Sequence, residues 1–138
     1  MLSIYPACFY KEKDGGYSVI FPDLDHLSTC GDTLENAMEM AVDCLAGFLY
    51  TAKQDGESVA VPSEIGSIDV NSEYDDYESA FVNMVAVDVA EYAKKHFERS
   101  VKKTLTIPAW LNERAEQANI NFSAVLQEAL KQRLQINQ

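Results

Sequence analysis

The side chains with the greatest potential for chemistry gather around Pro22. Asp23 and Asp25 stand two residues apart, and such a pair could hold the metal of a nuclease. A two-metal hydrolytic site needs several converging carboxylates, however, and aspartates beside a proline are typical of turns. We therefore predict that the protein is not an enzyme and has no catalytic residue, no metal and no cofactor. A metal-dependent nuclease is the competing interpretation of this pair.

The other candidate ligands are a histidine and three cysteines. His26 and Cys30 have a spacing that suits a zinc pair on a helix, but they fall on a predicted turn and strand, so we expect a structural role. Cys8, Cys30 and Cys44 follow no metal or redox spacing, which is typical of reduced thiols in the cytoplasm. The chain starts without the basic region of a signal peptide and has no apolar run long enough to span a membrane. We expect a cytoplasmic location.

The charge of the chain is divided between two segments. Residues 1–93 hold three basic and 18 acidic side chains, a formal charge of −15, whereas residues 94–138 hold eight basic and four acidic ones, a formal charge of +4. A basic segment can bind phosphate, and an acidic one favours a basic partner. The sequence therefore predicts two units with different partners.

Three short strands and one long helix are expected to position the residues around Pro22. Aromatic and β-branched residues predict strands over 2–10 and 16–21, with a short third strand over 28–30. Between the first two strands, Asp14-Gly15-Gly16 can supply the positive φ angles of a hairpin turn. A single apolar stripe predicts a helix over 32–56.

The start of this helix carries a capping pattern that can be assigned in two ways. Either Asp32 with Glu35 or Thr33 with Asn36 can satisfy the first backbone amides.

The next segments are predicted from composition and periodicity. Residues 62–80 are polar and acidic without periodicity, which predicts a long mobile loop. Residues 81–89 are apolar on both sides, which is typical of a strand whose two faces are covered. Asp88 and Glu91 form a capping pair for a short helix over 89–97.

The first half of the chain carries three motifs in a fixed order: Gly16-Tyr17, then Phe21-Pro22-Asp23-Leu24, then Gly31-Asp32-Thr33-Leu34 followed by an alanine-rich helix. Over about the first 50 residues, these motifs resemble the N-terminal signature of HicB antitoxins. The family usually continues after Leu24 with Pro-Gly or a similar small turn, and this chain has Asp25-His26 there. The resemblance implies a partial ribonuclease H-like βββαβ fold without catalysis. It also implies a partner, a small basic RNA-cutting toxin similar to HicA, and we expect contacts at Phe21, Pro22, Asp23 and Asp25.

The segment "KKTLTIPAW" predicts a strand followed by a helix. Leu105 and Ile107 share one face of this strand, and Lys102, Thr104 and Thr106 share the other. Pro108 suits the first turn of a helix over 109–118, and Asn121 is a good N-cap for a second helix. One strand and two helices are too few to bury their apolar stripes, so we expect two copies to pair their strands.

This strand-helix-helix unit resembles the ribbon-helix-helix family over residues 101–136. Paired strands of that family enter the major groove of DNA. The resemblance implies that Lys102, Thr104 and Thr106 read base edges, and that Asn121, Phe122 and Ser123 bring a helix N-terminus to a phosphate. Lys103 would also touch phosphate. Threonine departs from the longer readers common in the family, so base readout would either be weak or depend on thymine methyl groups.

These observations predict an α+β protein with a toxin-binding domain over 1–93, a linker over 94–100 and a ribbon-helix-helix over 101–138. We expect a homodimeric antitoxin that neutralises a HicA-like toxin and represses its own operon by binding operator DNA, with higher-order assembly left open. The alternative is a stand-alone transcription regulator whose N-terminal domain senses a small ligand. Lys102 and Lys103 could also be solvated charges that protect an edge strand.

Overall fold

The computed structural model describes residues 1–98 and 100–136, which divide into two compact units, Met1–Ser100 and Val101–Gln138. The division falls later than the expected domain end at residue 93, because helix α2 (Val89–His96) runs across that point and Phe97 packs against the core. Residue 99 of the expected linker and residues 137 and 138 of the expected C-terminal module lie outside the described residues.

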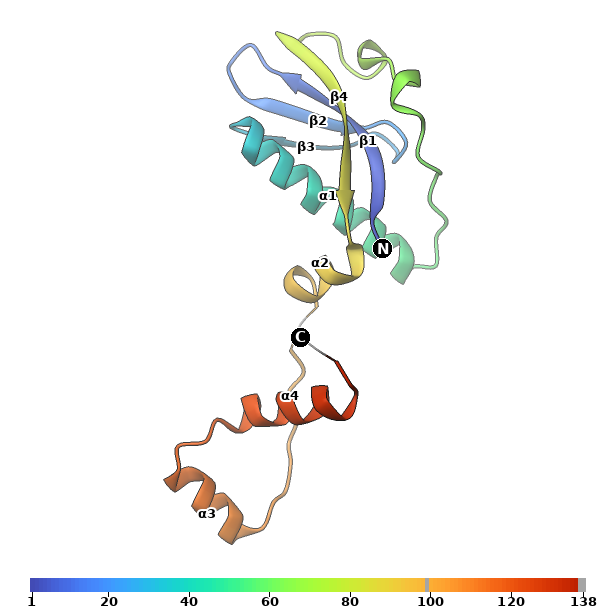
Figure 1. The fold of residues 1–138 in the computed structure, drawn as a ribbon. Coiled ribbons are helices and arrows are strands. Elements are labelled where there is room, and N and C mark those ends of the chain that lie inside the picture. The colour runs from blue at the N-terminus through green and yellow to red at the C-terminus, as the bar shows by residue number, and fades with distance from the viewer. Residues whose placement is uncertain (99, 137–138) are drawn as a thin grey trace. The chain divides into compact units, whose positions relative to one another are not determined.

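The N-terminal unit is a mixed α+β fold built on an antiparallel sheet in the order β3-β2-β1-β4 (Figure 1). The expected order of three strands, a long helix, a strand and a short helix is confirmed. The strands are β1 (Ser3–Lys11), β2 (Tyr17–Phe21), β3 (Leu27–Gly31) and β4 (Ser79–Val87), and the long helix is α1 (Leu34–Gln54). No described helix is long and apolar enough to cross a membrane.

The predicted hairpin turn joins β1 to β2. Gly15 has a φ of 100°, a conformation that residues with a Cβ rarely adopt. The turn is closed by a hydrogen bond from the Glu12 amide to the Gly16 carbonyl at 2.8 Å, and the Asp14 side chain accepts from the Gly16 amide at 3.1 Å. These contacts set the register in which Lys11 lies opposite Tyr17.

The segment from Gly31 to Leu34 ends β3 and begins α1. A Cβ on Gly31 would lie 2.4 Å from the Ala37 amide nitrogen, so only glycine allows this close approach of strand and helix. The Thr33 hydroxyl accepts a hydrogen bond from the Asn36 amide at 3.1 Å, and the Asn36 side chain accepts from the Asp32 amide at 3.2 Å. The helix is therefore capped by Thr33 with Asn36, the second of the two expected arrangements.

The core lies between the sheet and α1. Because side chains alternate along a strand, Tyr5 and Phe9 of β1 face α1, whereas Cys8 and Tyr10 face the opposite side. The helix side of the core is formed by small residues and one leucine, Ala37, Ala41, Leu45 and Ala46. These small side chains let the helix pack closely on the sheet.

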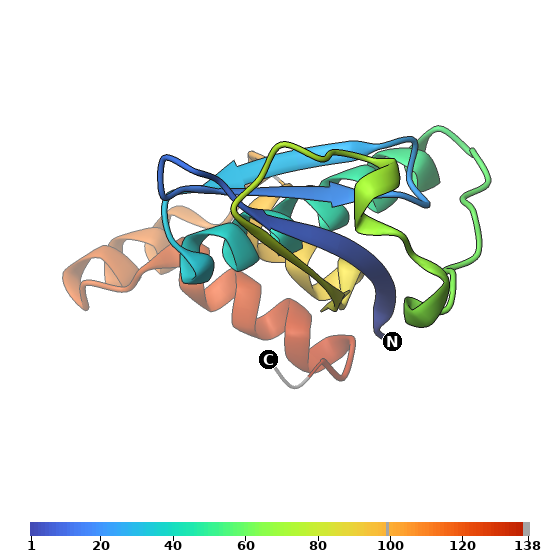
Figure 2. The same cartoon turned by 90° about the horizontal axis from the view of Figure 1, so that it is seen from above.

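The opposite face of the sheet is covered by the crossing loop, defined here as residues 57–78. The loop expected over residues 62–80 contains two short 3-10 helices, Ile65–Ser67 and Val70–Ser72, and its last two residues belong to β4. On this face the Tyr10 hydroxyl donates to the Val70 carbonyl at 2.6 Å, whereas the Tyr5 hydroxyl, on the α1 side, donates to the Ala60 carbonyl at 2.6 Å near the start of the loop. Figure 2 shows the loop passing in front of β1.

Strand β4 lies at an edge of the sheet, next to β1. Val85 and Val87 are buried against the core, but Phe81 and Met84 are exposed. The expectation that both faces of this strand are covered is therefore wrong for the single chain, since the described elements leave these two side chains exposed.

The C-terminal unit contains two helices, α3 (Ala109–Gln117) and α4 (Phe122–Arg133). Both were expected, and Asn121 caps α4 by accepting a hydrogen bond from the Ala124 amide at 3.1 Å. Pro108 is the N-cap of α3 rather than a residue of its first turn. The expected strand around Leu105 is not formed in the single chain, because a strand needs a partner for its backbone groups.

Candidate partner-binding surfaces

The turn between β2 and β3 holds the residues expected to contact a toxin. The Leu24 amide donates to the Phe21 carbonyl at 3.2 Å, and the Leu27 amide donates to the Leu24 carbonyl at 3.0 Å. Asp25 and His26 both have φ values in the left-handed region, 55° and 58°. They thus take the conformation that glycine adopts most easily, at the point where the sequence departs from the HicB pattern.

The four expected contact residues differ in the exposure of their side chains. Phe21 is fully buried in the core, whereas Pro22 is half-buried and Asp25 is exposed. Asp23 points to the crossing loop: its carboxylate accepts hydrogen bonds from the Ser63 amide at 2.7 Å and from the Ser63 hydroxyl at 2.6 Å. Of the four, Pro22 and Asp25 therefore form the accessible part of the turn.

Two hollows lie beside the crossing loop. One, of about 140 Å³, is lined in part by Asp23, Asp25 and Glu57. The other, of about 530 Å³, lies over β2 and β3 and is lined in part by Glu12 and Glu73. Both carry carboxylates, whereas the ligand-sensing alternative calls for an apolar pocket with a few convergent polar groups.

The carboxylates around the second hollow are held by neighbouring side chains. The Tyr74 hydroxyl donates to Glu12 at 2.9 Å, and this hydrogen bond raises the pKa of Tyr74. Glu73 forms a hydrogen bond with Nδ1 of His26 and is only 10% exposed. Burial raises the pKa of Tyr10 beneath the loop, because a phenolate there would lose its solvation. The loop and the sheet are thus joined by polar side chains that the sequence alone did not connect.

Of the residues considered as metal ligands, Asp23 and Asp25 line one hollow, whereas Cys30 lies on β3. Within residues 1–98 and 100–136, no group of three or more His, Cys, Asp or Glu side chains is placed to hold a metal ion. Asp23 accepts a hydrogen bond from the Ser63 hydroxyl, and His26 forms a hydrogen bond with Glu73. Cys30 is an exposed free thiol on β3.

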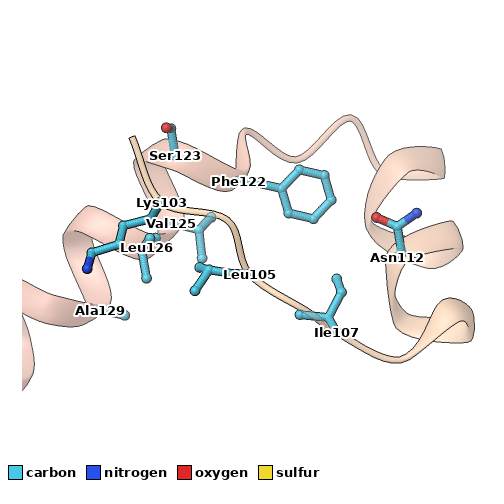
Figure 3. Close-up of a pocket in the computed structure, with 9 residues that line it drawn as sticks. All are labelled: Lys103, Leu105, Ile107, Asn112, Phe122, Ser123, Val125, Leu126 and Ala129. Carbon is cyan, nitrogen blue, oxygen red and sulfur yellow. The ribbon is translucent and has the colours of Figure 1, made fainter. Parts of the chain in front are cut away.

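The C-terminal unit carries an apolar groove of about 490 Å³ between its extended segment and α4. Figure 3 shows Leu105 and Ile107 on the extended segment facing Phe122, Val125 and Leu126. No described residue of this unit is buried, and Ile107 remains 42% exposed. The unit therefore has an apolar face but no closed core.

Three of the seven expected DNA-binding residues line this groove. Lys103 and Ser123 line it, and the Phe122 ring lies inside it (Figure 3). The side-chain oxygen of Asn121 is used in capping α4. The remaining three, Lys102, Thr104 and Thr106, are exposed and do not line the groove, as their alternation with Leu105 and Ile107 predicts.

Residues 5–130 match the family model described as HicB-like antitoxin of bacterial toxin-antitoxin system. An uncharacterised 14.9 kDa protein of Haemophilus phage HP1 is 31% identical over 114 residues, which cover 83% of this chain and 80% of the phage protein. Antitoxin HicB 1 of Photorhabdus laumondii is 39% identical over 62 residues. That match covers 45% of this chain and 40% of the Photorhabdus protein, so the chain spans less than half of that relative.

Two solved structures are similar over nearly the whole chain. One, described as a toxin-antitoxin complex from Streptococcus pneumoniae, contains a chain that is 31% identical with a TM-score of 0.61; the alignment covers 96% of this chain and 99% of that one. The Burkholderia pseudomallei antitoxin HicB is 19% identical with a TM-score of 0.52, over 93% of this chain and 96% of that one. This second likeness supports the fold.

Proposed function

Because the chain belongs to the HicB-like antitoxin family, we propose that it neutralises a HicA-like mRNA-cleaving toxin by direct binding and regulates its own operon by binding DNA. The observation that carries this proposal is the match over 96% of the chain to a protein found in a toxin-antitoxin complex. The family match over residues 5–130 covers parts of both compact units, so the proposal concerns the chain as a whole.

The N-terminal unit is the proposed toxin-binding part. An RNA-cutting toxin must be basic to hold RNA, and residues 1–93 carry a formal charge of −15. Opposite charge speeds encounter, while specificity comes from a smaller buried contact. We place that contact around Pro22 and Asp25, because the turn is exposed there, with Phe21 and Asp23 supporting it from the core and the crossing loop.

The C-terminal unit is the proposed dimerisation and DNA-binding part. Its groove exposes Leu105, Ile107 and Phe122 in the single chain, and a second copy would bury them. Pairing of two extended segments would also satisfy their backbone groups and form a ribbon that fits the major groove. Lys102, Thr104 and Thr106 would then face the bases. Lys103 and the N-terminus of α4, with the backbone at Asn121, Phe122 and Ser123, would lie toward the phosphates, while the Phe122 ring stays in the groove.

A separation-of-function experiment tests both parts of this proposal. Replacing Lys102, Thr104 and Thr106 together with alanine should abolish the shift of operator DNA while the full chain still relieves toxin-induced growth arrest. The affinity of the wild type for operator DNA should fall steeply with salt, since phosphate contacts release counterions. A triple variant that shifts the operator like the wild type would contradict the ribbon assignment. A full chain that leaves growth arrest unchanged would contradict the antitoxin function.

A further inference from the structure

The hollow over β2 and β3 lies on the face of the sheet that carries the crossing loop. Its floor is formed by two cross-strand pairs, Ile20 with Ser28 and Ser18 with Cys30. Ile20 also lies opposite Cys8 of β1, which belongs to the loop side of the sheet. Because Ser28 and Cys30 are exposed, this space of about 530 Å³ is open to a partner.

Two carboxylates with unused acceptor capacity line the hollow. The Glu73 side chain is nine-tenths buried, with 10% exposed, and one of its oxygens bonds Nδ1 of His26. No residue in the described part of the chain donates to its other oxygen. Glu12 likewise accepts from the Tyr74 hydroxyl through a single oxygen, at 2.9 Å. An ionised carboxylate can accept more than one hydrogen bond, and a buried charge without full pairing is costly.

The lysines that are closest in sequence are engaged elsewhere. Lys11 and Lys13 flank Glu12, but they form ion pairs with Glu78 and Asp76. Across residues 1–98 and 100–136, neither Glu12 nor Glu73 forms an ion pair with a lysine or an arginine. The hollow therefore keeps its negative charge in the single chain.

The groups around the hollow favour arginine over lysine as the side chain that fills it. A guanidinium is planar, carries five donors that can serve two carboxylates, and stacks on aromatic rings. The Tyr74 ring lines the hollow and is linked to Glu12 by its hydroxyl. The lysine ammonium is a compact and strongly hydrated charge, so it would gain less from a half-enclosed site.

The hollow adjoins the turn proposed above as a toxin contact. His26, the hydrogen-bond partner of Glu73, belongs to the same turn as Pro22 and Asp25. A basic protein that sits on this turn would bring its side chains next to the hollow. A toxin that holds RNA phosphates is expected to carry arginines for that purpose.

We propose that the hollow over β2 and β3 receives one arginine side chain of the toxin, which bonds the carboxylates of Glu12 and Glu73 and stacks on the Tyr74 ring. This inference rests on the proposed antitoxin function and deepens it, because it names the chemical group that is recognised. The acidic unit then attracts its partner through its overall charge, whereas the hollow contributes specificity.

Binding of a purified HicA-like toxin to full-length variants tests the inference. Glu12→Gln and Glu73→Gln keep the shape of the side chain and remove its charge. Each should raise the dissociation constant by about tenfold or more, the loss expected for one charge-assisted hydrogen bond. The matched control is Glu39→Gln, at an exposed site of α1, which changes the formal charge equally. It should leave the dissociation constant nearly unchanged, because salt screens an exposed charge that lies outside the contact.

A third variant changes the space and not the charge. Cys30→Trp places a large side chain at an exposed position of the hollow and should also weaken toxin binding. Circular dichroism and an unchanged shift of operator DNA would show that each variant is folded. If Glu73→Gln is unstable, Glu12→Gln and Cys30→Trp decide the question.

Single arginine-to-lysine variants of the toxin identify the partner group. One of them should bind the wild-type chain more weakly and should lose little further affinity when combined with Glu12→Gln, because the two changes remove the same contact.

The outcomes separate this inference from the function on which it rests. A folded wild-type chain that does not bind the toxin would contradict the proposed function. Normal binding by folded Glu12→Gln and Cys30→Trp, with a wild type that binds, would overturn the hollow alone. An equal loss in Glu39→Gln would assign the effect to net charge and would also overturn it, as would the lack of any toxin arginine coupled to Glu12.

Discussion

The carboxylate of Asp23 accepts two hydrogen bonds from Ser63, one from the amide at 2.7 Å and one from the hydroxyl at 2.6 Å. The two residues are 40 positions apart, so this contact ties the turn after β2 to the crossing loop. It gives Asp23 a structural role in joining the two segments.

The first prediction concerns the contact between Asp23 and Ser63. Asp23→Ala should lower the free energy of unfolding by about 1–3 kcal/mol, because it removes two charge-assisted hydrogen bonds from a half-buried site. Ser63→Ala is the control: it keeps the amide donor and should cost less. Chemical denaturation measures both changes, and equal stability of Asp23→Ala and wild type would show that the contact contributes nothing.

A second prediction follows from the left-handed conformation of Asp25, whose φ is 55°. Asp25→Gly should raise the free energy of unfolding by up to about 1 kcal/mol, because glycine adopts this conformation without a steric penalty. Asp25→Val should lower it, since β-branched residues avoid positive φ. If the two variants had equal free energies of unfolding, the turn would not hold this conformation in solution.

The third prediction concerns alkaline pH and Tyr10. Burial raises its pKa above the ordinary value of 10.0, so the folded protein favours the neutral phenol. The resulting stability is complete below pH 10 and is lost as the pH rises through the higher pKa of the folded state. Tyr10→Phe should therefore make the alkaline fall in stability shallower, and at neutral pH it should cost about 0.5–1.5 kcal/mol for the hydrogen bond to Val70.

The control for this experiment is Tyr50→Phe, because the Tyr50 hydroxyl donates no hydrogen bond to any described residue. Denaturation curves recorded between pH 8 and pH 11, a range on either side of the ordinary tyrosine pKa, measure the effect. Parallel pH profiles for Tyr10→Phe and wild type would contradict the role given to Tyr10.

The fourth prediction concerns association through the C-terminal groove. Truncating an isoleucine that becomes buried typically costs about 2–5 kcal/mol, so Ile107→Ala should weaken dimerisation and DNA binding together. Ile107 is exposed in the single chain, and the loss should therefore appear in the dissociation constant. Val61→Ala, at an exposed site of the N-terminal unit, is the control. An unchanged dissociation constant for Ile107→Ala would exclude the groove as the dimer contact.

Elements with local signals were predictable from the sequence. The helix α1 could be placed because Thr33 and Asn36 form its cap and because its apolar stripe is continuous. The hairpin turn could be predicted because Gly15 allows a positive φ, and the start of α4 could be predicted because Asn121 is its N-cap. In each case the interaction joins residues close in the chain, so spacing alone carries the information.

Contacts between distant residues were not predictable in the same way. Nothing in the pattern of the loop indicates that Ser63 meets Asp23 or that Glu73 meets His26, because both pairings depend on how the sheet and the loop come together. The position of β4 at the sheet edge was also missed. Its apolar pattern predicts burial on both faces, and burial by a second chain cannot be distinguished in sequence from burial within one.

The most direct test of the antitoxin function is a titration of toxin activity with the purified full chain. A purified HicA-like toxin is incubated with RNA while the chain is added in increasing amounts. Cleavage should fall to zero near stoichiometric addition, and the Lys102, Thr104 and Thr106 triple alanine variant should inhibit equally well. Full RNA cleavage in the presence of excess folded chain would contradict the antitoxin function.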